Sequence, residues 1–535
     1  MELPNQLQQI ENAKQMLEQY DHRIENEDLN LGSYTQFDFS FLQHLEIHKL
    51  TIWYCSDNVL LVSSTIKELD LSSCDITNID ELQLDNLEVL NVSMNKLTEI
   101  INIGRFKKLK SLDLSLNRHI NLSGIQSLKN LEVLDIHLCY KVENFSLLTQ
   151  LPSLKELNMR EGYANLSVLK DMVQLTKLNV CNNQLEDINL LSSLINLEYL
   201  DICYNKIVDA DPLKFLVKLT KLDISGLDLQ NFSFLKSLKN LRKLGFTSQN
   251  KNYNQISDLV QLTKLHLECC DLNNINFLSS LKNLEYLNLH GNHGIDLTAL
   301  QHLEKLSYLD IGGCYHRGCY HFCYTEEIPL AIDISPLKYV VTLKQLDLRY
   351  SELNSISALK HLVHLQQLNL EGNECLVDIT PLQYLTQLNT LSLMSCNVYE
   401  ISALRPLVNL VSLNLESKQT INLNPLNKLV KLTSLEVREA DFKTIEDHPN
   451  FKELVLNKYM KESSDYVHIS VRKMDTIDTG TTALRTNQTK YQSFKARYNL
   501  TKLQIDSLLQ QQVRKQESFF NNIAQLFNIL CEAFQ

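Results

Sequence analysis

The stretch Leu197-Glu-Tyr-Leu-Asp-Ile-Cys-Tyr-Asn205 carries the pattern that decides the fold of this chain: Leu-x-x-Leu-x-Leu/Ile/Val-x-x-Asn/Cys. Versions of it open at intervals of 21 to 23 residues from Ile66 to Leu432, apart from one interval of 37 residues between Leu306 and Leu343. Self-similarity at such a period marks a repeat protein, in which each unit buries its apolar face against the next. The sequence therefore predicts a solenoid of about 18 stacked repeats over residues 42–458.

Each repeat is expected to contain one strand and one short turn of helix. Period-2 alternation directs pairs such as Leu69 and Leu71 into the core and the residues between them towards the opposite, concave face. Second halves such as Asp378-Ile-Thr-Pro-Leu-Gln383 leave room for only about 8–10 residues, which favours short 3₁₀ or α turns over long helices. The fold class is therefore an α/β repeat with a parallel concave sheet.

Thirteen cysteines are present, and five of them occupy the Asn/Cys position of the pattern: Cys74, Cys139, Cys270, Cys314 and Cys396. A small side chain at this position is expected to turn inward and form a hydrogen bond with the loop backbone. These positions predict buried free thiols and a reducing compartment rather than a disulfide framework.

Two stretches match the remaining consensus of a known repeat class, Asn95-Lys-Leu-Thr-Glu-Ile100 and Asn183-Gln-Leu-Glu-Asp-Ile188. In them the chain resembles the 22-residue class of leucine-rich repeats, and within that class the leucine-rich regulatory subunit of protein phosphatase 1 and the bacterial internalins. The resemblance covers about residues 42–457. It implies the leucine-rich repeat fold and the binding of a protein partner, and it transfers no binding residues, because the shared residues are those that pack the core.

The two ends of the chain have other patterns. Residues 1–41 carry apolar residues near helical spacing and are expected to form an N-terminal helical cap over the exposed end of the solenoid. Residues 459–485, rich in Ser, Thr and Asp, read as a linker. Residues 486–535 are expected to form a helical tail, either a coiled coil for self-association or partner docking, or a hairpin that folds back on the last repeat.

The 37-residue interval contains about 15 extra residues, near positions 312–330. The insert is rich in Cys, His and Tyr, and it includes Cys319 and Cys323. We expect an aromatic contact loop rather than a zinc site, because the cysteine spacing is not that of a standard zinc knuckle.

Charge and targeting signals narrow the class of partner. The formal charge is −12, which disfavours nucleic acid, since nonspecific attraction to a phosphate backbone is electrostatic. The first residues lack a basic and apolar export signal, and no apolar run is long enough to cross a membrane. The expected location is the cytoplasm, with the nucleus as an alternative.

Catalytic motifs are not recognisable in the sequence. It contains no glycine-rich phosphate loop, no Gly-x-Ser-x-Gly and no His-Glu-x-x-His. We therefore expect a protein that is not an enzyme and needs no cofactor or metal. The alternative is an activity in the insert or the tail, which would depend on Cys319 or Cys531.

The concave positions of the strands are where a partner site is expected. One position is largely Asp or Asn, and the position before it alternates between Lys and Tyr. Tyr and Arg dominate protein interfaces because they bury a large area at modest entropic cost. The candidate partner-binding residues are Lys177, Tyr199, Asp201, Tyr204, Lys221, Asp223, Lys243, Lys264, Glu268, Tyr286, His290, Tyr308, Asp310, Arg349 and Tyr350.

The same surface has two other interpretations. It can be an ordinary solvated sheet face, and the adjacent Cys181 and Cys203 can be a chance pair rather than a redox or metal site. The sequence as a whole predicts a non-catalytic scaffold or regulatory subunit that captures a partner protein. Its alternatives are a phosphatase regulatory subunit and an extracellular internalin-like adhesion protein.

Overall fold

The computed structural model describes residues 28–31, 42, 45–53, 65–80, 82–162, 166–229, 231–247, 253–292, 294–313, 332–416 and 421–438, with the backbone of 466–470. The chain divides into two compact units, Met1–Val471 and Arg472–Gln535. The expected helical tail, the insert with Cys314, Cys319 and Cys323, and most of the expected cap lie outside the described residues. All that follows concerns the first unit.

A long sheet runs through the described repeats, and it has 20 strands there. Its parallel strands are β1 (Asp28–Leu31), β2 (Lys49–Ile52), β3 (Glu68–Asp70), β4 (Val89–Asn91), β5 (Ser111–Asp113), β7 (Val133–Asp135), β9 (Glu156–Asn158), β10 (Lys177–Asn179), β11 (Tyr199–Asp201), β12 (Lys221–Asp223), β13 (Lys243–Gly245), β14 (Lys264–His266), β15 (Tyr286–Asn288), β16 (Tyr308–Asp310), β17 (Gln345–Asp347), β18 (Gln367–Asn369), β19 (Thr390–Ser392), β20 (Ser412–Asn414) and β21 (Ser434–Arg438). Each of these strands pairs with its neighbour one repeat away, and β22 (Tyr466–Ser470) joins β21 in the antiparallel direction. The parallel solenoid expected from the repeat is confirmed.

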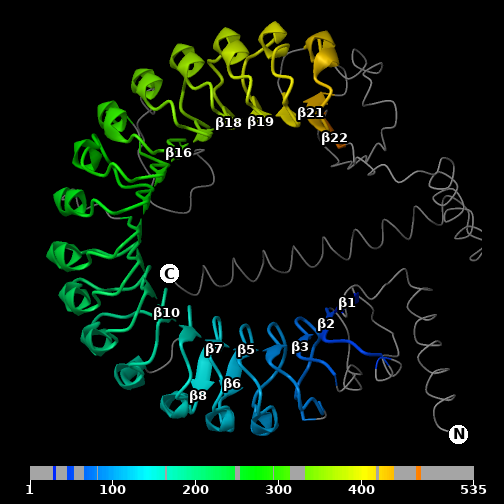
Figure 1. The fold of residues 1–535 in the computed structure, drawn as a ribbon, viewed down its shortest axis with the longest axis vertical. Coiled ribbons are helices and arrows are strands. Elements are labelled where there is room, and N and C mark those ends of the chain that lie inside the picture. The colour runs from blue at the N-terminus through cyan, green and yellow to red at the C-terminus, as the bar shows by residue number, and fades with distance from the viewer. Residues whose placement is uncertain are drawn as a thin grey trace, which may run out of the picture. The chain divides into compact units, whose positions relative to one another are not determined.

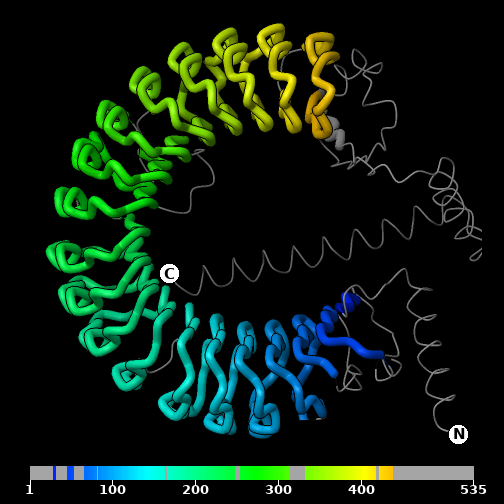
Figure 2. Tube along the Cα trace, in the orientation of Figure 1, coloured from blue at the N-terminus to red at the C-terminus, as the bar shows by residue number. Residues whose placement is uncertain are grey.

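Short 3₁₀ helices form the other side of the repeats. They are η2 (Ile103–Arg105), η3 (Ile125–Ser127), η4 (Phe145–Gln150), η5 (Leu166–Asp171), η6 (Asn189–Ser193), η7 (Asp211–Phe215), η8 (Ser233–Ser237), η9 (Asn254–Asp258), η10 (Asn276–Leu278), η11 (Thr298–His302), η12 (Ser335–Tyr339), η13 (Ser357–His361), η14 (Thr380–Tyr384), η15 (Ser402–Leu404) and η16 (Asn424–Lys428). Figure 1 shows the strands along the inside of the curve and these helices along its outside. Figure 2 shows each repeat as one turn of a continuous coil.

A ladder of leucines forms the core. The central residue of each parallel strand that faces inward, from Leu50 to Leu435, is at most 3% exposed. A buried leucine contributes about 1.5–3 kcal/mol, so the core between sheet and helices accounts for the stability of the stack. In the described residues, none of the helices has the length and apolar character needed to cross a bilayer.

Buried asparagines close the turn after several of the strands through hydrogen bonds to the backbone. Asn117 is fully buried, its Oδ1 accepts the N–H of Leu97, and its Nδ2 donates to the carbonyls of Val92 and Leu114. Cysteine replaces asparagine in other repeats with a simpler bond: the thiol of Cys139 donates to Leu114 O at 3.3 Å. Cys74, Cys270 and Cys396 make equivalent bonds, as expected from the sequence.

The sheet extends past both boundaries expected from the sequence. Strand β1 lies in the range assigned to the cap, and it pairs in register with β2 through Leu29 and Leu50. Strand β22 lies in the range assigned to the linker. A second small sheet, β6 (His119–Asn121) with β8 (Lys141–Glu143), lies in the second half of its repeats. None of these strands carries the full repeat pattern, which is why the periodicity did not indicate them.

Candidate functional site

Seven consecutive strands place one side chain each in a single row on the concave face, here called the concave row. Its members are Lys177, Tyr199, Lys221, Lys243, Lys264, Tyr286 and Tyr308, from β10 to β16. They are direct partners across the sheet because every repeat between β10 and β16 keeps the same register. The sequence-based alignment of these residues into one row is therefore confirmed.

Aromatic rings gather at one end of the concave row. The rings of Tyr286 and Tyr308 stack with centroids 4.1 Å apart and planes 6° apart. His266 packs against Tyr286 at 4.9 Å, and the ammonium of Lys264 lies 5.5 Å from the same ring. These contacts hold the tyrosines in fixed orientations, which lowers the entropic cost of using their exposed parts in an interface.

The tyrosines of the concave row are half-buried and remain neutral. Burial is the main cause that raises the pKa of Tyr199, Tyr286 and Tyr308. Nearby carboxylates add to this shift, Asp201 for Tyr199 and Asp310 for Tyr286. The three hydroxyls therefore keep their protons at physiological pH and offer both a donor and an acceptor.

The lysines of the concave row fall into two groups. Lys177 forms an ion pair with Glu156 on the preceding strand, with Nζ and Oε1 2.6 Å apart. Among the described residues, Lys221, Lys243 and Lys264 form no ion pair. The pKa of Lys243 is lowered by burial first and then by Lys221 and Lys264, as expected where like charges are stacked.

The Asp/Asn position next to the concave row has a structural role. A side-chain oxygen accepts the backbone N–H two residues further on, as Asp223 does from Ser225 at 2.9 Å and Asp201 from Cys203 at 3.1 Å. Asp310 makes the same bond to Gly312. This turn ends each strand, so the candidate residues Asp201, Asp223 and Asp310 are used within the fold.

Three candidate residues that are not members of the concave row contact other parts of the solenoid. Arg349 donates through two nitrogens to Asp347, and the Tyr350 hydroxyl donates to Glu371 at 2.6 Å. The ring of Tyr204 lies over Gly226, where a Cβ would meet it at 2.6 Å. The structure therefore separates these side chains from the concave row.

Glu268 and His290 belong to a polar cluster beside the tyrosines. Glu268 accepts from Asn288 at 2.5 Å, and the nearby His266, whose Nδ1 lies 3.6 Å from Oε1 of Glu268, is the main cause that lowers its pKa. His290 lies with Nδ1 3.6 Å from Oδ1 of Asp310, which is an ion-pair distance rather than a hydrogen bond. The proximity of Asp310 raises the pKa of His290.

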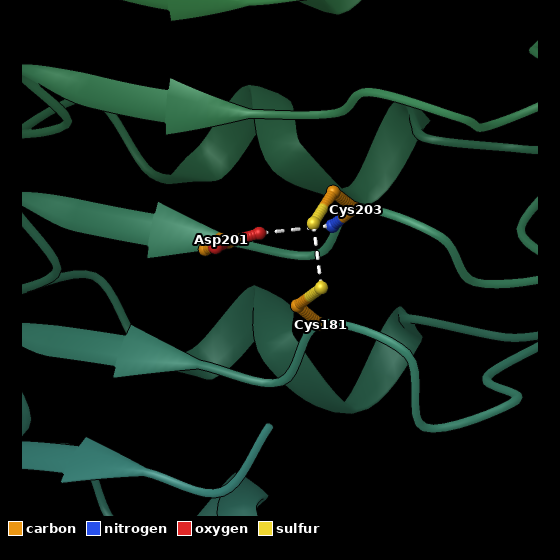
Figure 3. Close-up of side chains that lie close together, drawn as sticks. All are labelled: Cys181, Asp201 and Cys203. Atoms are coloured by element: carbon orange, nitrogen blue, oxygen red, sulfur yellow. Dashed lines mark hydrogen bonds between the residues drawn. The ribbon is translucent and has the colours of Figure 1, made fainter. Parts of the chain in front are cut away.

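Cys181 and Cys203 lie against each other with sulfurs 2.6 Å apart, and Asp201 is close to both (Figure 3). Two thiolates and a carboxylate are a donor set that suits a thiophilic ion such as Zn²⁺. However, two sulfurs on one tetrahedral Zn²⁺ lie roughly 3.8 Å apart, given Zn–S bonds of about 2.3 Å. The contact with Cys181 and, after it, burial raise the pKa of Cys203, so its thiol stays protonated and donates to the Cys181 sulfur.

His266 was missed as a member of the site. It contacts Tyr286 on one side and Glu268 on the other, and so links the tyrosines of the concave row to the polar cluster. The available signal was the departure from Asp/Asn at two successive repeats, where Gly245 and His266 stand instead.

Comparison with known proteins supports the leucine-rich repeat fold. The family described as Leucine Rich repeats (2 copies) matches residues 173–215, and no curated protein matches the chain. A solved internalin, InlF of Listeria monocytogenes, is 24% identical, covers 67% of this chain and 82% of its own, and has a TM-score of 0.32.

Two other solved structures are similar. A leucine-rich repeat protein of Leptospira interrogans is 19% identical, covers 78% of this chain and 91% of its own, and has a TM-score of 0.40. The complex of TLR13 with the single-stranded RNA ssRNA13 is 22% identical, covers 76% and 68%, and has a TM-score of 0.51. At this identity the likeness concerns the fold alone.

Proposed function

Since the chain is a leucine-rich repeat protein, we propose that it is a non-catalytic scaffold that captures a partner protein on the concave face of its solenoid. The observation that carries this proposal is the concave row, which spans seven adjacent strands and collects Tyr and Lys side chains. The neighbouring Asp201, Asp223 and Asp310 are used within the fold, whereas the side chains of the concave row are presented in register.

The physical argument rests on preorganisation. A partner that binds to fixed side chains avoids the cost of ordering them, which is about 0.5–1.5 kcal/mol for each immobilised side chain. Tyr286 and Tyr308 are already ordered by their stack, and the sheet beneath them is continuous. Aromatic anchors on a rigid sheet are the arrangement that concentrates binding energy in a few residues.

Replacing Tyr199, Tyr286 and Tyr308 together with Ala tests the proposal. Partner proteins recovered by affinity purification of the full chain are expected to be lost, with the melting temperature nearly unchanged. The matched control replaces Tyr339, Tyr384 and Tyr399, which are 54–60% exposed and lie outside the strands. Equal recovery with both triple variants contradicts the proposal.

The identity of the recovered protein decides between the finer roles. A phosphatase catalytic subunit as the main species would identify the chain as a phosphatase regulatory subunit. We place the protein in the cytoplasm, and cell fractionation tests this against an extracellular, adhesive role.

A further inference from the structure

The lysines at the centre of the concave row differ from the lysines elsewhere in the same register. Lys49 is paired with Glu68 at 3.0 Å, and Lys177 is paired with Glu156 at 2.6 Å, each on the adjacent strand. Lys221, Lys243 and Lys264, here called the lysine ladder, stand directly opposite one another on β12, β13 and β14. In this part of the described sheet, lysine faces lysine where a glutamate would neutralise it.

The Asp/Asn position next to the concave row supplies no carboxylate to two of these three repeats. It holds Asp201 and Asp223 in β11 and β12, but Gly245 and His266 in β13 and β14. The carboxylate of Asp223 leans over Gly245, where an added Cβ would meet it at 2.5–2.7 Å, and it accepts the N–H of Ser225. Burial is the main cause that lowers the pKa of Lys243, and the charged groups among the described residues that add to the shift are the two other lysines.

Stacked like charges destabilise a sheet, so the lysine ladder is a cost to the fold that no ion pair among the described residues offsets. This cluster of positive charge contrasts with the chain as a whole, whose formal charge is −12. A ligand that brings negative charge to these three positions would remove the repulsion and gain the full electrostatic attraction. The lysine ladder is therefore complementary to an anionic ligand.

We infer that the lysine ladder and the adjoining Tyr286–Tyr308 stack bind an acidic, extended segment of the partner protein, rich in Asp or Glu. Parallel strands lie about 4.8 Å apart, so the three ammonium groups span roughly 10 Å across the sheet. Alternate residues of an extended peptide lie about 6.7 Å apart, so two successive carboxylates on one side fall within reach of the three flexible lysines. The next side chain on that side of the peptide then lies over the Tyr286–Tyr308 stack.

The inference rests on the proposed function, because it names the chemistry of the partner that the concave face captures. Acidic protein is favoured over nucleic acid by the charge of the whole chain, which repels a long phosphate backbone. A short segment that contacts only the lysine ladder avoids most of that repulsion, since charges more than about 8–10 Å away are screened at physiological salt.

The test measures binding of labelled peptides to the full-length protein by fluorescence anisotropy. One probe is an extended peptide of alternating Glu and Thr that ends in Phe, and its counterpart carries Gln in place of Glu. The first is expected to bind, and to bind more weakly as salt is added, while the second is not. The triple variant K221E/K243E/K264E is expected to lose affinity on the order of tenfold or more.

The matched control is K236E/K239E/K360E, which changes the net charge equally at exposed lysines outside the strands. It is expected to bind as the unaltered protein does. Equal binding of the Glu and Gln peptides, or an equal loss in both triple variants, overturns the inference. Tighter binding of an oligo-uridine RNA than of the Glu peptide, through the same three lysines, overturns it as well.

Affinity purification with the same variants separates the inference from the proposed function. If K221E/K243E/K264E still recovers the partner while the tyrosine variant does not, the concave row binds a partner. The inference that the bound segment of this partner is acidic is then wrong. If both variants recover it, the concave row is not the binding surface and the proposed function fails too.

Discussion

The two faces of one strand differ in what they contribute to the protein. In β11, Leu200 points inward and is fully buried, while Tyr199 and Asp201 stand on the concave face. The inward position holds leucine in every parallel strand of the long sheet from β2 to β21. The concave position before it changes from Glu to Lys, Tyr, Gln, Thr and Ser along the same sheet.

The constancy of one face and the variation of the other have different physical origins. An inward side chain contacts two neighbouring repeats, so any change in its size creates a cavity or a clash. A concave side chain meets water on one side and tolerates most replacements. The first face therefore determines stability, and the second is available for function. Each of the following predictions tests that division.

The largest effect is expected from a buried asparagine. Asn117→Ala removes the groups that bond Leu97 N, Val92 O and Leu114 O, all buried. The free energy of unfolding should fall by about 3–5 kcal/mol, because buried polar groups are left without partners. Urea denaturation followed by circular dichroism measures the change.

Its control is Asn130→Ala. Asn130 is exposed and donates one bond to Lys107 O at 2.8 Å, so we expect a loss below about 1 kcal/mol. Similar losses of unfolding free energy in the two variants would mean that the buried asparagines do not determine the stability of the solenoid.

The inward face was predictable from sequence because its rules are local. The alternation in a stretch such as Leu197–Asn205 fixes which residues point inward, and the Asn/Cys position fixes which groups close the turn. Strands β1 and β22 were not predicted, since each is recruited by pairing with a sheet edge rather than by its own pattern.

Cys181 and Cys203 cross the division, because they occupy a concave register yet are 2% and 7% exposed. Their sulfurs are in contact and their separation along the chain is 22 residues. Treatment with diamide, which accepts the two hydrogens and is reduced to the hydrazine, should join them in a disulfide. Closing a loop of this length stabilises a protein by about 3 kcal/mol.

Intact mass and the melting temperature report the reaction. We expect loss of two hydrogens and a higher melting temperature in the unaltered protein and in Cys139→Ser. Cys203→Ser should show neither change. The reaction should be slow at neutral pH, since the pKa of Cys203 is raised and the thiolate is the reacting species. A mass change that persists in Cys203→Ser would assign the oxidation to other thiols.

The concave face was predictable only in part. The repeat spacing gives the register, so the row from Lys177 to Tyr308 followed from sequence. It does not give the direction of each side chain. Sequence alone therefore did not reveal that Arg349 is hydrogen-bonded to Asp347, or that Asp223 accepts the N–H of Ser225 in the turn after its strand. Such pairings depend on rotamers and on the neighbouring repeat.

A smaller effect is expected from His290 on the concave face. The nearby carboxylate of Asp310 is the main cause that raises its pKa; burial and Arg349 oppose the shift, Cys269 adds to it, and Glu268 also faces the ring. A raised pKa means that the charged pair stabilises the fold fully below the unfolded pKa of about 6.5. That contribution is lost as pH rises through the folded pKa.

His290→Gln should therefore lower the melting temperature at acidic pH and have little effect at alkaline pH. The measurement compares melting curves of the variant and the unaltered protein from pH 5.5 to 9, a range chosen around the histidine pKa of about 6.5. The exposed His302 in η11 provides the control, and His302→Gln should leave the pH dependence unchanged. A pH-independent loss in His290→Gln would mean that the ring acts by packing alone.

The smallest effect is expected from two lysines of the concave row, whose replacement should change the free energy of unfolding in opposite directions. Lys177→Met removes the ion pair with Glu156 and should destabilise the fold by about 0.2–1 kcal/mol. Lys243→Met removes repulsion from Lys221 and Lys264 and should be neutral or slightly stabilising. Both shifts should shrink in high salt, because exposed charges are screened. With the acidic peptide bound, Lys243→Met should instead destabilise the protein, since the peptide then supplies a negative charge close to the lysine. Equal destabilisation by both variants in the free protein would show that the lysine ladder is an ordinary solvated face.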